Sequence, residues 1–462
     1  MRRLLSCLLI VAGSASAQTP PPDEAHTRAV AAGYKALTLC SASFNAAGRP
    51  EADIAALELR GIYPEYDALV QALPATIDAQ ARAVSVPFDD ALPPRIAAWR
   101  PALGCAQLPI GADAAAIAAL PRLAQAAPDL DARPWPLGER DATATPSGDA
   151  PALDAVIAAA LDASQFGRGH ATTGVVVLQR GRIVAERYRD GFGPHVAQRT
   201  WSVAKSLAGA LVGVATGEGR LDVHQPAPVP EWQRPGDPRA AITTDQLLRM
   251  ASGLYSDTAG NRTDGLYFGG ATVAEAAAGW PLQATPGTRF RYANNDSVLA
   301  VHGLRAATGD EARALARPYT DLFWPLGMTR TYAETDWQGG FVLSSQVWST
   351  ARDLARFGLL LQGDGVFAGR RVLPDGWVRD ATTATGPQPE GAFGYGATLW
   401  LLQRSPGVPA DAFGAFGNRG QYVIVVPSRD VVIVRRGEDP AGQRFDVAAF
   451  VAAVLATLDG AG

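Results

Sequence analysis

Ser202 and Lys205 are the two residues whose types and spacing point most directly to chemistry. They lie three positions apart in WSVAKSLAGALVG, and residues at that spacing on a helix share one face. A serine hydroxyl becomes a nucleophile only beside a base, and burial lowers the pKa of lysine from about 10.4. The apolar neighbours of Lys205 predict that burial. We therefore predict that Ser202 is a nucleophile and Lys205 its base, against the plainer alternative of a capping serine and a surface lysine.

Lysine is scarce in this chain, which makes Lys205 informative. Of 41 basic residues only Lys35 and Lys205 are lysine, and all others are arginine. A GC-rich genome accounts for much of this bias. Arginine nevertheless stays protonated at any working pH, whereas a desolvated lysine can lose its proton. A lysine retained inside an apolar helix favours a role that arginine cannot fill.

Tyr292 and Asn294 form a second group of polar residues, just past the turn at Pro286-Gly287. A tyrosine hydroxyl can shuttle a proton when a cation or a hydrogen bond supports it. An asparagine amide can both anchor Lys205 and bind a substrate amide. Taken alone, the pair is equally consistent with a structural turn.

The third candidate is the segment 417–421, GNRGQ, which runs straight into a predicted strand at 422–426. A glycine at a strand edge lets a substrate backbone approach closely, and we expect Gly420 to do so. We also expect the N–H of Gln421 to join that of Ser202 in holding a developing oxyanion. A simple hairpin is the alternative interpretation of this segment.

Together and in this order, the three segments resemble the serine β-lactamase and DD-peptidase superfamily. The similarity is greatest to its class C-like branch of esterases, DD-carboxypeptidases and 6-aminohexanoate-dimer hydrolases. It covers about residues 165 to 455, through TWSVAKSLAGALVG, ITTDQLLRMASGLYSD, FRYANNDSVLA, GGFVLSSQVWSTARDLARFGLLL and GNRGQYVIVVPSRDVVIV. The resemblance implies that Ser202 is acylated and that Lys205 is its base or proton relay. It further implies that Tyr292 protonates the leaving group and that Asn294 binds substrate.

The third motif departs from the superfamily pattern, which usually reads Lys-Thr-Gly or His-x-Gly. The matching positions here are Asn418, Arg419 and Gly420. The missing cation disfavours recognition of a β-lactam or peptide carboxylate, unless Arg419 replaces it. We therefore expect an amidase or esterase acting on a small molecule. The alternatives are a DD-carboxypeptidase, a β-lactamase, and a ligand sensor that is acylated without turnover. Residues 255–257 are weaker candidates for the pocket, by resemblance to nylon-oligomer hydrolases.

Other active-site chemistries have little support in the sequence. It contains no Gly-x-Ser-x-Gly segment, and its five histidines fall in no catalytic motif. The zinc-binding patterns His-x-His and His-Glu-x-x-His do not occur either. We therefore expect neither a metal nor an organic cofactor. The net charge of −4, without a charged block, argues against a nucleic-acid partner.

The N-terminal residues 1–17 have the pattern of an export signal. Arg2 and Arg3 precede a short apolar run, and Ala-Ser-Ala ends the segment. We expect the mature protein in the periplasm or outside the cell, with no stable membrane anchor after cleavage. An oxidising compartment favours a disulfide between Cys40 and Cys105, with two separate buried thiols as the alternative.

The pattern along the chain predicts two regions after the signal, with a boundary near residue 147. Residues 18–147 are Ala-rich and mainly helical in pattern, ending in a linker, and 148–462 form the hydrolase domain. Within that domain, β-branched runs predict hairpins at 173–188 and 422–434, on either side of a buried helix at 202–215. The expected fold is α/β (α+β), a β-lactamase/transpeptidase-like antiparallel sheet flanked by helices, with a helical subdomain. The oligomeric state is not indicated.

Overall fold

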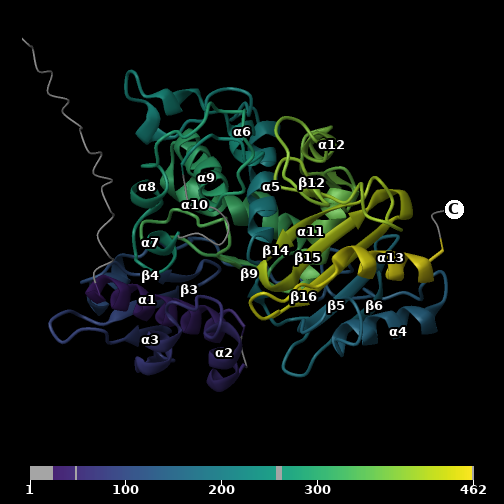
Figure 1. Ribbon diagram of the computed structural model, residues 1–462, viewed down its shortest axis with the longest axis horizontal. Helices are drawn as coiled ribbons and strands as arrows, with labels where there is room; N and C mark the ends of the chain where they lie inside the picture. The colour runs from purple at the N-terminus through teal and green to yellow at the C-terminus, as the bar shows by residue number, and fades with distance from the viewer. Residues whose placement is uncertain (1–23, 47–48, 256–262, 460–462) are drawn as a thin grey trace, which may run out of the picture.

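A computed structural model describes residues 24–46, 49–255 and 263–459. The predicted export signal, Ser256 and Asp257 lie outside the described residues. In Figure 1 the N-terminal region lies at lower left, a group of helices above it, and a large sheet at right. Helix α5 stands between the helices and the sheet. No helix in the described ranges is long and apolar enough to cross a bilayer.

The large sheet is antiparallel and has seven strands in the order β12-β13-β14-β15-β16-β5-β6. Its strands are β5 (Thr172–Gln179), β6 (Arg182–Tyr188), β12 (Gly394–Tyr395), β13 (Trp400–Leu401), β14 (Phe413–Gly417), β15 (Gln421–Val426) and β16 (Val431–Gly437). The early strand β5 pairs with the late strand β16, so distant segments complete one sheet. The predicted antiparallel sheet flanked by helices is confirmed.

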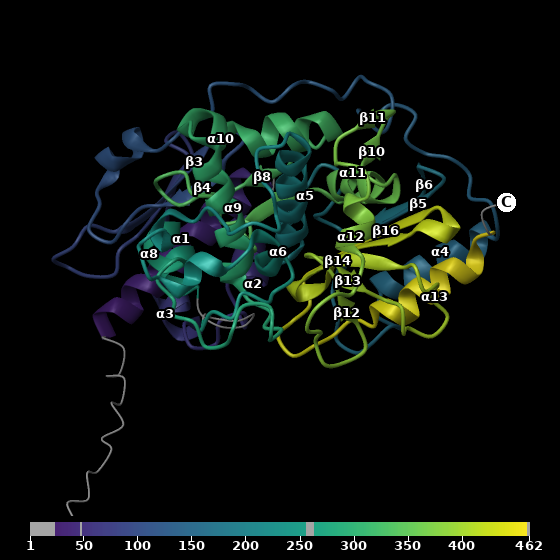
Figure 2. The ribbon, with the colours of Figure 1, turned by 90° about the horizontal axis from the view of Figure 1, so that it is seen from above.

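Helices cover both faces of this sheet. Helices α4 (Ala150–Leu161) and α13 (Val447–Thr457) lie along one face, and α11 (Ala351–Gln362) lies on the other (Figure 2). Alternate residues of a strand point to opposite faces. Accordingly Val175 packs in the cluster with α4 and α13, whereas Val176 packs in the main core with α11.

Helix α5 (Val203–Gly217) is buried on all sides from Val203 to Ala215, as its apolar composition predicts. Helix α9 (Asn294–Thr308) packs against it. The shorter helices are α6 (Thr244–Leu248), α7 (Asp264–Tyr267), α8 (Val273–Ala276), α10 (Glu311–Arg317) and α12 (Trp377–Ala381). These helices form the predicted helical part of the domain.

A small sheet leads the chain into α5. It has the order β7-β9-β8, with β7 at Gln198–Arg199, β8 at Tyr332–Ala333 and β9 at Val347–Ser349. A separate short pair joins β10 (Val366–Phe367) to β11 (Arg370–Arg371). Because β7 ends three residues before Ser202, this small sheet fixes the approach to the nucleophile.

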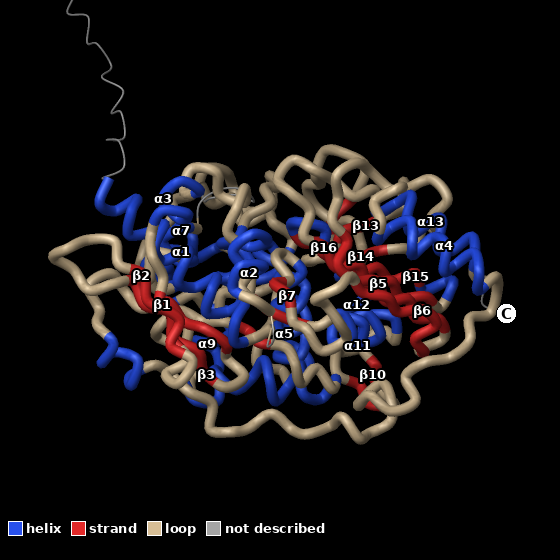
Figure 3. The backbone as a smooth tube through the Cα atoms, turned by 90° about the horizontal axis from the view of Figure 1, so that it is seen from below, coloured by secondary structure: helices blue, strands red, loops and turns tan. Residues whose placement is uncertain are grey.

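The N-terminal region combines helices with a second sheet. Its elements are α1 (Glu24–Phe44), α2 (Glu51–Glu58), α3 (Asp67–Ala72), β1 (Thr76–Asp78), β2 (Ala83–Val86), β3 (Arg95–Arg100) and β4 (Gly104–Gln107). The helices match the expectation, whereas the four-stranded sheet was not predicted. A long loop over 120–149 then crosses the molecule to α4, along the upper edge of Figure 2 and the lower edge of Figure 3.

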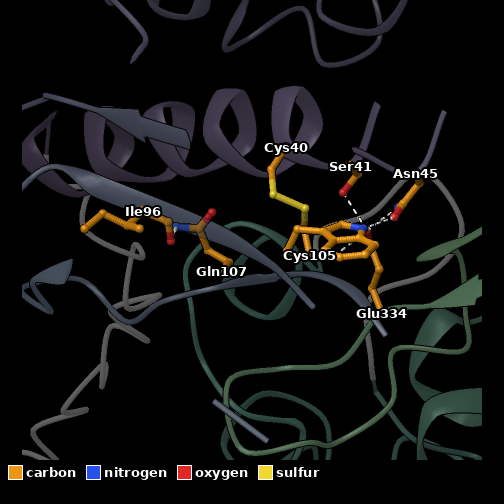
Figure 4. Close-up of a disulfide and its surroundings, with 8 residues drawn as sticks. Cys40, Ser41, Asn45, Ile96, Cys105, Gln107 and Glu334 are labelled. Atoms are coloured by element: carbon orange, nitrogen blue, oxygen red, sulfur yellow. Dashed lines mark hydrogen bonds between the residues drawn. A yellow bond between two sulfur atoms is a disulfide. The ribbon is translucent and has the colours of Figure 1, made fainter. Parts of the chain in front are cut away.

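The N-terminal region packs into the same hydrophobic core as α5 and α9. Polar contacts reinforce this packing. The Nη2 atom of Arg95 donates to the carbonyl oxygen of Phe268 at 3.0 Å. The buried carboxylate of Glu334 accepts from Ser41 Oγ at 2.6 Å and from the N–H of Cys105 at 3.1 Å (Figure 4). The region is therefore held to the rest of the described chain by both apolar and polar contacts.

The predicted disulfide between Cys40 and Cys105 is present and joins α1 to β4 (Figure 4). Both cysteines are fully buried. The bond closes a loop across a sequence separation of 65, which in the chain-entropy account stabilises the fold by about 4 kcal/mol.

We predict that replacing both cysteines with alanine lowers the free energy of unfolding by about 2–4 kcal/mol. Urea denaturation of the wild type and the double variant measures this difference. The wild type reduced under denaturing conditions and then refolded and measured in the presence of reductant is a control that keeps the cysteine side chains. Equal stability of the double variant and the oxidised wild type would show that the bond contributes nothing.

Candidate active site

Ser202 stands at the N-terminus of α5, where helix N–H groups lack partners within the helix. The preceding residue, Trp201, has a φ of +50°. This left-handed conformation is uncommon for a bulky residue and marks local strain. The turn presents Ser202 to a pocket while its neighbours on α5 are buried.

The ammonium-bearing end of Lys205 is buried beside Ser202. Its Nζ atom lies 3.0 Å from Oγ of Ser202, 2.7 Å from Oδ1 of Asn294 and 2.9 Å from the carbonyl oxygen of Ser344. Asn294 Oδ1 and the Ser344 carbonyl can only accept hydrogen bonds. A neutral amine would give its two hydrogens to these oxygens, and its lone pair would then face the Ser202 hydroxyl.

Burial lowers the pKa of Lys205 to about 7, and the charge of nearby Asp296 opposes this shift. The side chain is only 1% exposed, and water stabilises an ammonium far better than a protein interior does. A substantial fraction of Lys205 is therefore neutral near pH 7. That is the protonation state in which it can remove a proton from Ser202.

Tyr292 lies against the same pair of residues. The centre of its ring is 5.0 Å from Nζ of Lys205, and its ring packs against Tyr395 and Trp400. Burial raises the pKa of Tyr292 well above its usual value, although a hydrogen bond with Ser202 acts in the opposite direction. Tyr292 therefore holds its proton at neutral pH and can donate it, rather than act as a phenolate base.

Asn294 is the first residue of α9, which places it at the floor of the site. Its Oδ1 accepts from Lys205, and its Nδ2 donates to Oγ1 of Thr263 at 3.3 Å. Its side chain is thus oriented by contacts on both sides. The structure brings together Ser202, Lys205, Tyr292 and Asn294, all four of the residues predicted from the first two sequence groups.

A pocket of about 450 Å³ opens above Ser202. Its walls are rich in aromatic side chains, namely Tyr63, Trp201, Tyr267, Tyr292, Trp400 and Phe416. Among the described residues that line it, none is lysine, arginine or histidine. Across the described chain, no group of three or more His, Cys, Asp or Glu residues is placed to hold a metal ion. The lining also includes the acidic residues Glu65 and Asp264, so the described part of the pocket combines aromatic walls with carboxyl groups and offers no cation.

The third sequence motif meets the nucleophile at its first glycine. Strand β14 ends at Gly417, and a Cβ atom added there would lie 3.2 Å from the backbone nitrogen of Ser202 and 2.3 Å from the carbonyl oxygen of Thr200. Only glycine permits such an approach. Asn418 follows directly and lines the pocket, so its backbone lies beside that of Ser202.

Arg419 does not replace the missing cation of the third motif. Its guanidinium lies 2.5 Å from a carboxylate oxygen of Glu438 and 3.5 Å from one of Glu58. It is buried and is not among the described residues that line the pocket. Its positive charge is therefore paired with carboxylates inside the protein, as a buried arginine requires, and does not face a substrate in the pocket.

Gly420 and Gln421 are also turned away from the pocket, which corrects the expected placement of both. Gly420 packs against the guanidinium of Arg435. Gln421 pairs with Gly417 across β14 and β15, and its fully buried side chain accepts from Nε of Arg436 at 2.7 Å. The strand register therefore places Asn418, rather than Gln421, in the lining of the pocket that holds Ser202.

Several pocket residues were not predicted. Residues 62–65 come from the N-terminal region, and Tyr267, Ser345, Trp400 and Phe416 come from separate elements. No local motif marks any of them, because they meet only through long-range packing. Tyr255, a weaker candidate, is about half exposed and lies against Trp280, outside the pocket lining found among the described residues.

Comparisons with known proteins bear on this arrangement. The Beta-lactamase family model matches residues 153–455. The chain is 29% identical over 333 residues to a 6-aminohexanoate-dimer hydrolase from Paenarthrobacter ureafaciens, covering 64% of this chain and 80% of that protein.

Two solved structures share the fold. A putative 6-aminohexanoate-dimer hydrolase from Bacillus anthracis matches with 21% identity and a TM-score of 0.53, over 73% of this chain and 87% of that one. A family VIII carboxylesterase matches with 18% identity and a TM-score of 0.54, over 68% and 98% of the respective chains. At these identities the structural matches establish the fold alone.

Proposed function

Because the chain belongs to the Beta-lactamase family, we propose that it cleaves a small ester or amide through an acyl-enzyme on Ser202. The observation that carries this proposal is the 3.0 Å contact between Nζ of Lys205 and Oγ of Ser202 at the floor of an aromatic pocket. A nucleophile and a base within hydrogen-bond reach are the minimum for this chemistry.

In the first step, neutral Lys205 takes the proton of Ser202 as Oγ attacks the substrate carbonyl carbon. The negative charge then moves to the carbonyl oxygen. The N–H groups of Ser202 and Asn418 are the donors proposed to stabilise it, because the close approach of Gly417 brings their backbones together.

In the second step, the leaving group departs with a proton and the acyl-enzyme remains. Tyr292 is the proposed donor, since it lines the pocket with Ser202, its ring lies against Lys205, and burial keeps its hydroxyl protonated. The proton held by Lys205 then passes back to Tyr292. In the last step, water attacks the carbonyl carbon of the acyl-enzyme and the protons follow the reverse path. The water proton goes to Tyr292, the proton of Tyr292 passes to Lys205, and Lys205 returns a proton to Oγ of Ser202 as the acyl group leaves.

The substrate proposed carries no carboxylate at the end that enters the pocket. The described lining residues offer no cation for a carboxylate, and Arg419 is paired with Glu438. The pocket is therefore poorly suited to a β-lactam or a D-Ala-D-Ala peptide. Linear amides are favoured as a second substrate class by the relative from Paenarthrobacter ureafaciens, whose name is 6-aminohexanoate-dimer hydrolase.

A hydrolysis panel tests this proposal. It comprises nitrophenyl esters, linear amide oligomers, a D-Ala-D-Ala peptide and a chromogenic β-lactam. We expect kcat/KM for the best ester or amide to exceed that for the β-lactam at least about 100-fold, because an unpaired carboxylate in an apolar site costs several kcal/mol. Preference for the β-lactam or the peptide would contradict the proposed substrate. One burst of nitrophenol without further release would indicate a ligand sensor instead.

Activity should rise with pH through about 7, the pKa of Lys205. Below that pH the amine is protonated and cannot accept the proton of Ser202, so kcat/KM falls. Burial raises the pKa of Asp296 to about 7 as well, so the two groups titrate in the same range. Replacing Asp296 with asparagine removes the negative charge that it carries when ionised and that favours the ammonium, and the inflection should move to lower pH. Profiles of kcat/KM against pH for both proteins measure the shift. A flat wild-type profile, or a shift to higher pH in the variant, would rule out Lys205 as the titrating base.

Export is also part of the proposal, and the buried disulfide supports an oxidising compartment. The mature protein should then begin at Gln18. Mass spectrometry of the protein from a periplasmic fraction tests this; an intact Met1 terminus would contradict it.

A further inference from the structure

The loop over residues 62–65 joins α2 to α3 and lies far outside the segment 153–455 that the family model matches. All four of its residues nevertheless line the pocket that holds Ser202 and Tyr292. The N-terminal region thus supplies part of the wall around the nucleophile.

Aromatic packing and a hydrogen bond hold this loop in place. The ring of Tyr63 packs against Tyr34, at 5.0 Å between centroids, and against Phe268 of the hydrolase domain at 5.2 Å. Next to the loop, Oη of Tyr66 donates to Oδ2 of Asp264 at 2.6 Å. Both sides of the interface therefore fix the position of the loop over the pocket.

The guanidinium of Arg199 lies near the Tyr63 hydroxyl, where it opposes the larger, pKa-raising effect of burial. It also lies 5.9 Å from the ring centre of Tyr267, which packs against Phe268 beside Tyr63. Arg199 ends β7 and is buried. Its guanidinium lies 3.8 Å from the ring centre of Trp201 and donates to Oγ of Ser345 at 3.1 Å. Arg199 therefore connects the loop to two segments that border the catalytic pair.

Each of those segments positions one member of the pair. Trp201 precedes Ser202 and holds the strained left-handed conformation at the start of α5. Ser344, next to Ser345, accepts a hydrogen bond from Lys205 through its carbonyl oxygen. Arg199 thus contacts the residue that precedes Ser202 and the residue that follows Ser344, the hydrogen-bond acceptor of Lys205.

We propose that the N-terminal region completes the active site. Its loop over 62–65 is a specificity-determining wall, and Tyr63 is a positioning residue that acts through Arg199 on Trp201 and Ser345. The substrate this wall faces has a bulky apolar acyl or leaving group, as the aromatic lining favours. This inference rests on the function proposed above.

The first test enlarges the pocket. Ile62 is half-buried, so Ile62→Ala removes a wall with little effect on the core. We expect the ratio of kcat/KM for nitrophenyl octanoate to that for nitrophenyl butyrate to rise at least about fivefold, because a few methylenes in an apolar pocket change selectivity by 10-fold or more. A second series that varies the alcohol with a constant acyl group covers the leaving-group side. Leu92→Ala, an exposed position in the same region, is the control and should keep both wild-type ratios.

The second test removes one hydroxyl. Tyr63→Phe keeps the ring packing but removes the hydroxyl that lies near Arg199, and kcat should fall about tenfold with KM nearly unchanged, as expected for lost alignment. Tyr34→Phe is the matched control, since it also removes a buried hydroxyl from this aromatic cluster. The Tyr34 hydroxyl donates its hydrogen bond to the carbonyl oxygen of Glu58. That control should lose stability and keep kcat.

Two results would overturn this inference: wild-type ratios in both substrate series for Ile62→Ala, or a wild-type kcat in Tyr63→Phe. The first variant decides the matter if the second does not fold. Ser202→Ala is assayed in parallel with the same esters. Turnover that survives in Ser202→Ala refutes the proposed function itself, whereas an inactive Ser202→Ala beside unchanged loop variants refutes only the role of the loop.

Discussion

Ser202→Ala should lose at least about 10⁴-fold in kcat/KM for a nitrophenyl ester, because removal of a nucleophile leaves only the binding and oxyanion contributions. The alanine fits without strain, since Ser202 caps α5 with no side-chain hydrogen bond to its backbone. The thermal stability of the variant should therefore stay close to that of the wild type. Steady-state kinetics and thermal unfolding measure the two quantities.

Ser206→Ala is the matched control for this variant. Ser206 lies on the same helix, but its hydroxyl donates to the carbonyl oxygen of Thr398 at 2.6 Å, away from the pocket. Its loss should cost about 1 kcal/mol of stability and leave turnover near the wild-type rate. Comparable activity loss in both variants would mean that the helix, rather than the Ser202 hydroxyl, was damaged.

Lys205→Arg should lose at least about 10³-fold in kcat, because general-base catalysis contributes 10²–10⁴-fold and the larger side chain also disturbs the site. Arginine keeps the positive charge but cannot give it up at any working pH. Its planar guanidinium also cannot reproduce the contacts of Nζ with Asn294 and Ser344. The inflection near pH 7 should disappear from the residual activity.

Lys35→Arg is the matched control, because it makes the same substitution at the only other lysine of the chain. The Nζ atom of Lys35 donates to the carbonyl oxygens of Val70 and Leu73 in the N-terminal region. Lys35→Arg should keep kcat within about twofold, as is usual for partly exposed positions away from a site. A Lys205→Arg variant that hydrolyses esters as fast as Lys35→Arg would refute the assignment of Lys205 as the base.

The catalytic group was predictable because its geometry is mostly local. Ser202 and Lys205 are three residues apart on a helix, and helical spacing alone brings their side chains together. Tyr292 and Asn294 were then identified through the order of the motifs. The structure adds what spacing cannot give, namely the burial that lowers the pKa of Lys205 and keeps Tyr292 protonated.

The oxyanion donor was harder to predict, because it depends on strand register. The segment GNRGQ has two glycines, and either could meet the nucleophile. A shift of one residue in a strand turns every side chain to the opposite face. Only the pairing of Gly417 with Gln421 shows that Asn418 faces the pocket and that Arg419 points inward to Glu438.

The N-terminal sheet and its contribution to the pocket were missed for two physical reasons. Strands β3 and β4 read RIAAWR and GCAQ, and alanine is depleted in strands, so tertiary pairing overrides the local preference. Residues 62–65 line the same pocket as Ser202 although they lie far from it in the sequence, and no local pattern encodes that arrangement.

The central claim is that Ser202 forms a covalent intermediate, and peptide mass spectrometry after labelling with a fluorophosphonate tests it most directly. Trypsin releases the labelled site as the peptide Thr200–Lys205, TWSVAK, in which fragmentation separates Ser202 from Thr200. We predict one adduct per protein molecule, on Ser202, and none in Ser202→Ala. An adduct on any other residue, or continued ester hydrolysis by a protein without any adduct, would contradict this account.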